Sequence, residues 1–323
     1  MFLGGTSGAS RIGEHYWPTP NDAFVKERGL SHFAQPTESG RLESALWGCV
    51  RNGGSRFHEG IDLKALGRDR RGEATDSIYA FDDGVVRYVN LSPSKSSYGR
   101  YIVVEHPQWM PGMVTLYAHL SAVPDGIVAG VSVRGGETIA TMGRSASYTI
   151  PRERAHLHFE IGMWLGPQFQ TWYDRQRFDT PNDHQAFNGM NIVGTNVWAL
   201  FQSLRSGETR SVAEYFAMQG TAVLVTIWDD GIPDILRVNP ELMTNTVLPA
   251  DHAGWRIAFS ASGLPLRFEA ISASKRSGSK RVIVEIVDER LAKTDACVSM
   301  MQRRSSGSPS NRLSSLLNRL FTN

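Results

Sequence analysis

The sequence has few cysteines and no long apolar run. Among 323 residues only Cys49 and Cys297 are present, and they form no CxxC pair of the kind that holds structural zinc. An oxidising compartment would allow a bridge between them, but sequence separation does not place two cysteines within bonding distance. We therefore expect two unpaired, buried thiols. No stretch approaches the roughly 20 apolar residues that a transmembrane helix needs.

The chain also lacks an excess of positive or negative charge. The 34 basic and 32 acidic residues give a net charge of +2, whereas a nucleic-acid-binding domain is usually strongly basic. The N-terminal segment MFLGGTSGASRIGEHYW has no basic region followed by an apolar one, so no signal peptide is visible. With 41% hydrophobic and 20% charged residues, the composition is that of a soluble globular protein. We expect no nucleic-acid partner and no membrane span, and the oligomeric state is left open.

The length favours two domains, because a single core rarely serves a chain of more than about 250–300 residues. Changes in composition along the chain divide it into four parts. We predict an extended N-terminal segment (1–43), a β domain (44–195, with a core at 44–164 and a wrapping extension at 165–195), a small accessory α+β module (196–300) and a basic tail (301–323).

The core at 44–164 has the pattern of antiparallel β structure. Its short runs are rich in Val, Ile, Tyr and Thr, and glycine-containing turns such as Asp83-Gly84 and Gly135-Gly136 separate them. Helical periodicity is hard to find in this region. The pattern therefore predicts a mainly β fold, and the runs are SIYAFDDGVVRYV, YGRYIVVEH, MVTLYAHLS, ETIATMG and HLHFEIG.

The accessory module mixes helical and strand-like segments. Residues 196–204 and 209–219 are predicted to be short helices, the second with Thr209 or Ser211 as its N-cap. Four strand-like runs follow, and the last two flank the polar connector SKRSGSK, which suggests a hairpin. These runs are TAVLVTIW, WRIAFSA, LRFEAISA and RVIVEIV. In the basic tail, four leucines at i, i+3, i+4 and i+7 from Leu313 allow a short amphipathic helix, and we expect this terminus to fold back on the body.

Four of the nine histidines lie, with one aspartate, in three compact settings of the β region. FHEGID places His58 and Asp62 four residues apart, HLHFE places His156 and His158 two apart, and TLYAHLS places His119 at the end of a run. In a strand, residues two or four positions apart face the same side, so each pair can converge on one ion.

These residue types suit a hydrolytic zinc site. Imidazole nitrogen and carboxylate oxygen are common zinc ligands, and a catalytic zinc usually takes three protein ligands and leaves one position for water. Five candidates for three positions leave two side chains free to handle protons. The pKa of zinc-bound water falls to about 7, and a neighbouring base completes its deprotonation.

Each setting taken alone has a simpler explanation. His58 and Asp62 would form a surface ion pair or a capped turn, an HxH pair arises by chance on an alternating strand, and His119 would be a half-buried, hydrogen-bonded histidine. Two glutamates lie close by. We expect Glu59 to be a solvated turn residue and Glu160 to be a strand residue that faces away from the metal. The conjunction of three settings in one β region favours the metal site.

These residues resemble those of the lysostaphin/LytM-type zinc endopeptidases of bacterial cell walls. That family carries a His-x-x-x-Asp, a Tyr-x-His and a His-x-His motif in this order, which here read HEGID (58–62), YAH (117–119) and HLH (156–158). The resemblance covers roughly residues 44–164. The surrounding pattern also fits, in WGCVR (47–51), YAFDDGVVRYV (79–89) and GGETIATMGRSA (135–146).

The resemblance implies that one zinc ion per chain is held by His58, Asp62 and His158, and that His119 and His156 are the catalytic pair. One of the pair would act as general base, and the other would stabilise the developing oxyanion or protonate the leaving amine. The sequence does not say which does which.

The resemblance also implies a two-sheet antiparallel β fold with the zinc in an open groove. Arg51, Tyr98 and Tyr117 are weak candidates for residues that line this groove, and they fit ordinary loop or core positions equally well. The implied reaction is hydrolysis of a peptide bond in peptidoglycan cross-links or stem peptides, with zinc-bound water as nucleophile. The implied location is the cell envelope, periplasmic or secreted.

Two other functions fit the same residues. One is a non-catalytic or autoinhibited module that keeps the zinc-site residues, is blocked by residues 1–43 or 165–195, and binds the cell wall or activates another hydrolase. The other is a zinc hydrolase that acts on a free peptide or another small amide.

Overall fold

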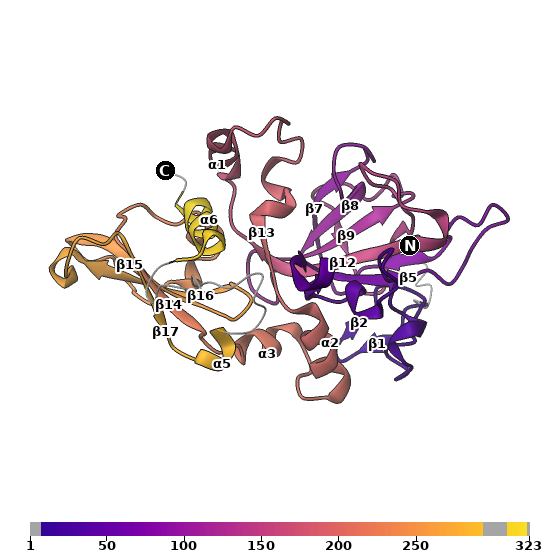
Figure 1. Ribbon diagram of the computed structural model, residues 1–323, viewed down its shortest axis with the longest axis horizontal. Helices are drawn as coiled ribbons and strands as arrows, with labels where there is room; N and C mark the ends of the chain where they lie inside the picture. The colour runs from indigo at the N-terminus through magenta and orange to yellow at the C-terminus, as the bar shows by residue number, and fades with distance from the viewer. Residues whose placement is uncertain (1–7, 293–308, 322–323) are drawn as a thin grey trace. The chain divides into compact units, whose positions relative to one another are not determined.

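The strand β12 (His156–Trp164) organises the main sheet of the protein. The computed structural model describes residues 8–292 and 309–321. Within these ranges the main sheet has seven strands in the order β10-β7-β8-β9-β12-β13, and β5 also pairs with β12 (Figure 1). The other strands are β5 (Ile61–Lys64), β7 (Gly84–Asn90), β8 (Arg100–Glu105), β9 (Met113–Leu120), β10 (Ser132–Val133) and β13 (Ile192–Gly194).

Three two-stranded sheets accompany the main sheet. They are formed by β1 (Arg11–Ile12) with β2 (His15–Tyr16), β3 (Gly48–Arg51) with β4 (Arg56–His58), and β6 (Ser77–Tyr79) with β11 (Thr138–Thr141). All of these pairs are antiparallel, so the predicted mainly β, antiparallel fold is confirmed. Short 3-10 helices lie between them: η1 (Leu30–His32), η2 (Leu42–Ala45), η3 (Asn52–Gly54) and η4 (Arg152–Arg154).

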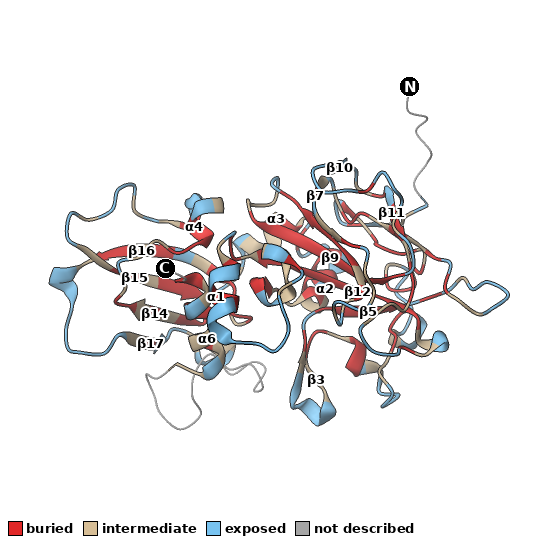
Figure 2. Ribbon diagram, turned by 90° about the horizontal axis from the view of Figure 1, so that it is seen from above, coloured by how far each residue is buried: buried red, intermediate tan, exposed pale blue. Residues whose placement is uncertain are grey.

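The strands β9 and β12 are buried along almost their whole length (Figure 2). Because side chains alternate along a strand, the two faces of β12 have different surroundings. Phe159, on one face, packs in the aromatic core against Phe81, Tyr117 and Phe201 at centroid distances of 5.2–5.9 Å. His158, its neighbour in sequence, lies on the opposite face. The core therefore fixes the strand that carries the candidate site.

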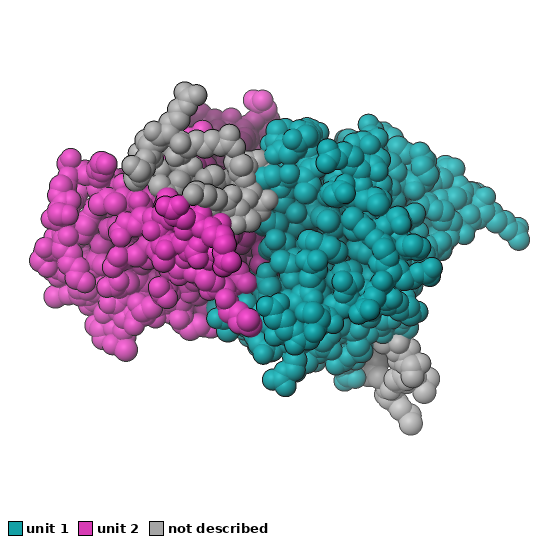
Figure 3. Space-filling model, turned by 60° about the horizontal axis from the view of Figure 1, so that its bottom comes forward, with its two compact units in different colours: residues 1–161, 196–217 teal, residues 162–195, 218–323 magenta. Residues whose placement is uncertain are grey.

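The compact units divide the chain differently from the predicted boundaries (Figure 3). Unit 1 comprises Met1–Ile161 and Asn196–Ala217, and unit 2 comprises Gly162–Thr195 and Met218–Asn323. The predicted wrapping extension at 165–195 is thus part of unit 2. The first two helices of the predicted accessory module, α2 (Val197–Ser206) and α3 (Val212–Ala217), are part of unit 1.

The packing of α2 explains why it belongs to unit 1. Asn196 caps the helix by accepting a hydrogen bond from the backbone N–H of Ala199 at 3.0 Å. Phe201, which is fully buried, contacts Trp17 at 4.9 Å and stacks on Phe159 at 5.9 Å between ring centroids. The helical periodicity identified the apolar face of α2, but periodicity does not identify the sheet that this face covers.

Unit 2 contains a four-stranded antiparallel sheet in the order β16-β15-β14-β17. The predicted hairpin across SKRSGSK is wrong, because the two strands that flank this connector lie at opposite edges of the sheet and pair with β15 and β14 instead. The strands are β14 (Val223–Ile227), β15 (His252–Phe259), β16 (Pro265–Ser272) and β17 (Val282–Ile286).

The helices of unit 2 include the predicted amphipathic helix near the C-terminus. α6 (Asn311–Leu320) buries Leu313 and the three leucines that follow it at helical spacing, so this segment does fold back on the protein. The other helical segments of unit 2 are α1 (Phe169–Gln176), α4 (Ile235–Val238), α5 (Glu289–Ala292), η5 (Gln185–Phe187), η6 (Gly189–Asn191), η7 (Pro240–Leu242) and η8 (Ala273–Lys275). No helix within residues 8–292 and 309–321 combines the length and the apolar composition needed to cross a membrane.

The cysteine expectation needs a correction. Cys49, on β3, is disulfide-bonded rather than a free thiol. Cys297 lies outside the described residues. Sequence separation carries no information about the distance between two side chains in space, which is why the expectation of free thiols failed.

Candidate metal centre

Three short elements bring His58, Asp62 and His158 together. β5 pairs antiparallel with β12 so that Asp62 lies directly opposite His158. His58 ends β4, and the tight turn to β5 passes through Gly60. A Cβ atom at Gly60 would lie 2.3 Å from the carbonyl oxygen of Phe159, so this close approach of the turn to β12 requires glycine.

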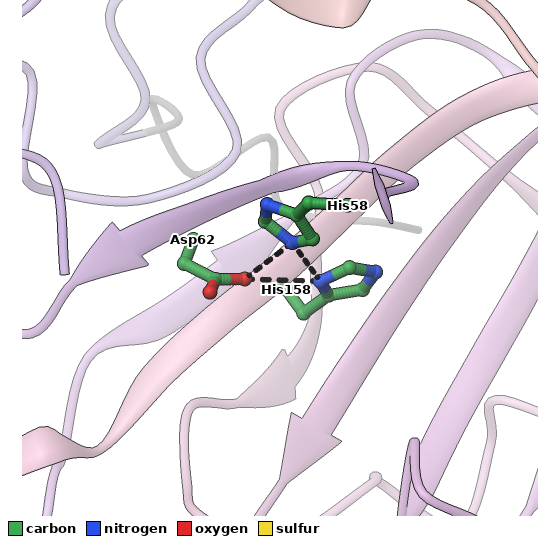
Figure 4. A group of neighbouring side chains, drawn as sticks. All are labelled: His58, Asp62 and His158. Carbon is green, nitrogen blue, oxygen red and sulfur yellow. Dashed lines mark hydrogen bonds and ion pairs between the residues drawn. The ribbon is translucent and has the colours of Figure 1, made fainter. Parts of the chain in front are cut away.

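The three side chains meet at one point (Figure 4). Asp62 Oδ1 lies 3.1 Å from His58 Nε2 and 3.0 Å from His158 Nδ1, and these two ring nitrogens lie 3.1 Å apart. The exposed fractions are 0% for His58, 3% for Asp62 and 5% for His158. These residues form the one group within the described ranges whose ligand atoms are close enough to hold a metal ion.

The outer hydrogen bonds of the two histidines determine which ring nitrogen faces this point. His58 Nδ1 lies 2.8 Å from the carbonyl oxygen of Leu46, which can only accept, so Nδ1 donates and Nε2 presents an electron pair. His158 Nε2 donates to Glu160 Oε1 at 2.7 Å, and its Nδ1 faces Asp62. An electron pair of His58 Nε2, an electron pair of Asp62 Oδ1 and the second ring nitrogen, His158 Nδ1, therefore face a common point, which only a cation can satisfy fully.

That cation is either a proton or a metal ion. Burial lowers the pKa of His158, but its hydrogen bonds to Asp62 and Glu160 outweigh burial and raise the pKa to about 9. A proton on His158 Nδ1 can be donated in a hydrogen bond to either Asp62 or His58, whereas a metal ion contacts all three ligand atoms. Ligands at 2.0–2.1 Å around a tetrahedral ion are about 3.3 Å apart, and the observed separations of 3.0–3.1 Å are close to this value. The three residues fit a metal ion.

His119, at the end of β9, and His156, at the start of β12, lie beside the three ligand atoms. Their ring centroids are 4.7 Å apart, and His156 Nε2 is 3.7 Å from Asp62 Oδ1. His119 Nδ1 donates to the carbonyl oxygen of Ser145 at 2.9 Å, and His156 Nδ1 donates to that of Arg154 at 2.7 Å. In the neutral form of each ring, Nε2 therefore carries an electron pair and no hydrogen. Burial lowers the pKa of both rings, that of His119 strongly, with His156 and His158 contributing to the shift of His119.

His119 has a strained backbone. Its φ of 63° lies in the left-handed region, which costs a non-glycine residue about 1–3 kcal/mol. The backbone N–H of His119 donates to the carbonyl oxygen of Tyr98 at 2.9 Å, and the contact with Ser145 holds the ring. The surrounding structure thus fixes the direction of this side chain.

The weak groove candidates have different positions. Arg51 donates to Asp62 Oδ2 at 2.5 Å, and the Tyr98 hydroxyl donates to Glu160 Oε1 at 2.6 Å, so both contact residues of the site. Tyr117 is fully buried, and its hydroxyl accepts the backbone N–H of Phe81, so it is a core residue.

The two nearby glutamates also differ. Glu59 is exposed in the turn between β4 and β5, as predicted. Glu160 does not face away from the metal centre: it is 2% exposed and contacts His158. The period of two along a strand places residues 156, 158 and 160 on one face, and this signal was sufficient to predict the contact.

Comparison with known families identifies the same region. Residues 56–169 match the model of peptidase family M23, and this match confirms the resemblance predicted from the three motifs. The match includes all five histidine and aspartate positions of the candidate site. The search of the curated proteins found no match to the chain.

Several solved structures are similar to parts of the chain. A zinc-containing peptidase from Vibrio cholerae has 30% identity over 32% of this chain and 26% of its own, with a TM-score of 0.25. The catalytic domain of the prophage-encoded M23 protein EnpA from Enterococcus faecalis has 20% identity over 41% and 81%, with a TM-score of 0.30. The catalytic domain of the antimicrobial peptidase lysostaphin from Staphylococcus simulans has 18% identity over 54% and 96%, with a TM-score of 0.31. The chain thus spans about a quarter of the Vibrio cholerae protein.

Proposed function

We propose that the M23-type region of this protein is a zinc-dependent endopeptidase that hydrolyses peptide bonds in peptidoglycan cross-links or stem peptides. The observation that carries this proposal is the convergence of His58 Nε2, Asp62 Oδ1 and His158 Nδ1 at mutual distances of 3.0–3.1 Å. Two imidazole nitrogens and one carboxylate oxygen form a donor set that suits Zn²⁺, and three protein ligands leave one tetrahedral position open.

Bound zinc would supply Lewis acidity, which lowers the pKa of water and polarises the scissile carbonyl group. His58, Asp62 and His158 would hold the ion. His119 and His156 handle protons: their lowered pKa values keep Nε2 unprotonated at neutral pH, so either ring can accept a proton there. Once protonated, that ring becomes a donor to the developing oxyanion or to the leaving amine.

The substrate class and the location rest on the family. The M23 match and the ordered motifs of cell-wall peptidases support peptidoglycan as substrate and the cell envelope as the place of action. Arg51 donates to Asp62 and Tyr98 donates to Glu160, so in this proposal both residues support the site rather than bind substrate.

Digestion of defined cross-linked muropeptides tests the proposal. The zinc-loaded protein should release fragments that differ by one hydrolysed peptide bond, identified by mass spectrometry, and a chelator should abolish the products. Unrelated peptides of equal length serve as substrate controls. Cleavage of these controls at the same rate would indicate a general zinc peptidase, and no cleavage of any substrate by zinc-loaded protein would indicate a binding or activator module.

A further inference from the structure

A chain of two hydrogen bonds leads away from the metal centre. Glu160 Oε1 accepts from His158 Nε2 at 2.7 Å and from the Tyr98 hydroxyl at 2.6 Å. The carboxylate is 2% exposed, so it has little access to water. A buried carboxylate is stable only where donors satisfy it, and these two donors meet at one of its oxygens.

His158 is oriented differently from the other histidines around the site. His58, His119 and His156 each donate through Nδ1 to a backbone carbonyl and turn Nε2 inward. His158 turns Nδ1 inward and donates through Nε2 to a carboxylate. The backbone orients three of the rings, but the orientation of the fourth depends on the side chain of Glu160.

We propose that Glu160, held by Tyr98, is a positioning residue that makes His158 a metal ligand through Nδ1. The carboxylate accepts a hydrogen bond from the Nε2–H of His158 and thereby fixes both the tautomer and the plane of the ring. Carboxylates that accept from metal-bound histidines act in this way in many metal sites, and their loss typically weakens metal binding 10–100-fold. The inference rests on the metal site of the proposed function.

Tyr98 connects this support to the proton-handling histidine. Its hydroxyl group holds Glu160, and its backbone carbonyl accepts the N–H of His119, the residue with the left-handed backbone. Its ring also lies 5.6 Å from the ring of His158 between centroids. One residue thus holds the ligand support through its side chain and His119 through its main chain, so Tyr98→Phe separates the two contributions.

Metal affinity of the full-length protein measures the effect directly. Co²⁺ and Zn²⁺ are titrated into metal-free wild-type protein, Glu160→Gln, Glu160→Leu and Tyr98→Phe, with a chelator of known affinity as competitor. We expect the dissociation constant to rise about 10-fold or more for Glu160→Gln, most for Glu160→Leu within a 10–100-fold range, and less for Tyr98→Phe. The visible absorption of bound Co²⁺ should change in the Glu160 variants, because it reports the geometry of the ligands.

Two variants at comparable buried positions serve as controls. Glu105→Gln alters another buried strand carboxylate, which accepts the N–H of Gly112, and Tyr173→Phe removes a hydroxyl of another buried tyrosine, which donates to the carbonyl oxygen of Thr180. Both should lower thermal stability without a change in metal affinity or in the Co²⁺ spectrum.

Wild-type affinity and spectrum in both Glu160 variants would overturn the proposal. If the Glu160 variants do not fold, Tyr98→Phe provides the test, and wild-type affinity and spectrum in that variant would overturn the proposal. A wild-type protein that binds neither metal would instead refute the proposed function, so the two failures are distinguishable.

Discussion

Nε2 of His58 lies 3.1 Å from Nδ1 of His158, although the two residues are 100 positions apart in the sequence. The carbonyl oxygen of Leu46 fixes the first ring and the carboxylate of Glu160 fixes the second. Two ring nitrogens that face each other at this distance, with Asp62 Oδ1 at 3.0–3.1 Å from both, leave a position that a metal ion satisfies. The predictions below follow from this arrangement and from the packing that supports it.

His119→Ala should separate catalysis from metal binding. His119 contributes none of the three converging ligand atoms, so zinc content should remain at one ion per chain. Turnover of a cross-linked muropeptide should fall about 10²–10⁴-fold, the usual contribution of a proton-transfer group. Loss of zinc from this variant would show that His119 is needed for the metal site itself.

Arg51→Gln should weaken metal binding through Asp62. Arg51 donates to Oδ2 of Asp62 at 2.5 Å and so leaves Oδ1 directed at the two histidines. We expect the dissociation constant for zinc to rise about 10-fold, measured by chelator competition. Arg56 lies opposite Arg51 in the β3–β4 pair and is exposed, so Arg56→Gln is a matched control with unchanged affinity. Equal affinities of both variants would contradict the role of Arg51.

The residues of the candidate site were more predictable from the sequence than the surrounding contacts that hold them in place. The motif order and the strand period of two pointed to His58, Asp62 and His158, whose side chains do converge, and to His119 and His156, which lie beside them. Their roles as ligands and as a catalytic pair stay predictions. The contact of Glu160 with His158 was missed, although the same period places both residues on one face. The disulfide of Cys49 and the left-handed backbone of His119 have no local sequence pattern; the latter depends on the contacts of His119 with Tyr98 and Ser145.

The fold was predictable in its elements and less so in its connections. Alternating apolar runs predicted the strands β14 to β17, but β16 and β17 pair with different neighbours because strand order depends on long-range contacts. The helix α2 was predicted from its periodicity, whereas its membership of unit 1 depends on the contact of Phe201 with Trp17 and Phe159.

Phe201→Ala should destabilise unit 1. Its ring is fully buried among the aromatic side chains of the core, and removal of such a ring costs about 3–5 kcal/mol through lost contacts and the cavity that remains. The free energy of unfolding, measured by urea denaturation, should fall by this amount. Leu91 is 61% exposed in the same unit, and Leu91→Ala should change the free energy by less than about 0.5 kcal/mol. A wild-type value for Phe201→Ala would mean that α2 does not pack on this core.

The stability of the metal-free protein should decrease in mild acid. Burial lowers the pKa of His106 to about 4, whereas an unfolded histidine titrates near 6.5. The unfolded state therefore binds the proton first, and stability is lost as pH falls from about 6.5 towards 4. Between pH 7.5 and pH 5 the contribution of His106 is about 2 kcal/mol.

The variant His106→Gln isolates this contribution. It removes the titrating group, which contacts Thr115 at 2.8 Å, and should reduce the difference in unfolding free energy between the two pH values by about 2 kcal/mol. An unchanged pH dependence in this variant would contradict the assignment of the acid sensitivity to His106.

Zinc stoichiometry, measured by inductively coupled plasma mass spectrometry, tests the central claim most directly. The wild-type protein should hold one zinc ion per chain after dialysis. His58→Ala, Asp62→Ala and His158→Ala should each lose it, since each leaves an incomplete ligand set, while the folded state is checked by circular dichroism. Full zinc content in all three folded variants would contradict the metal centre and the function built on it.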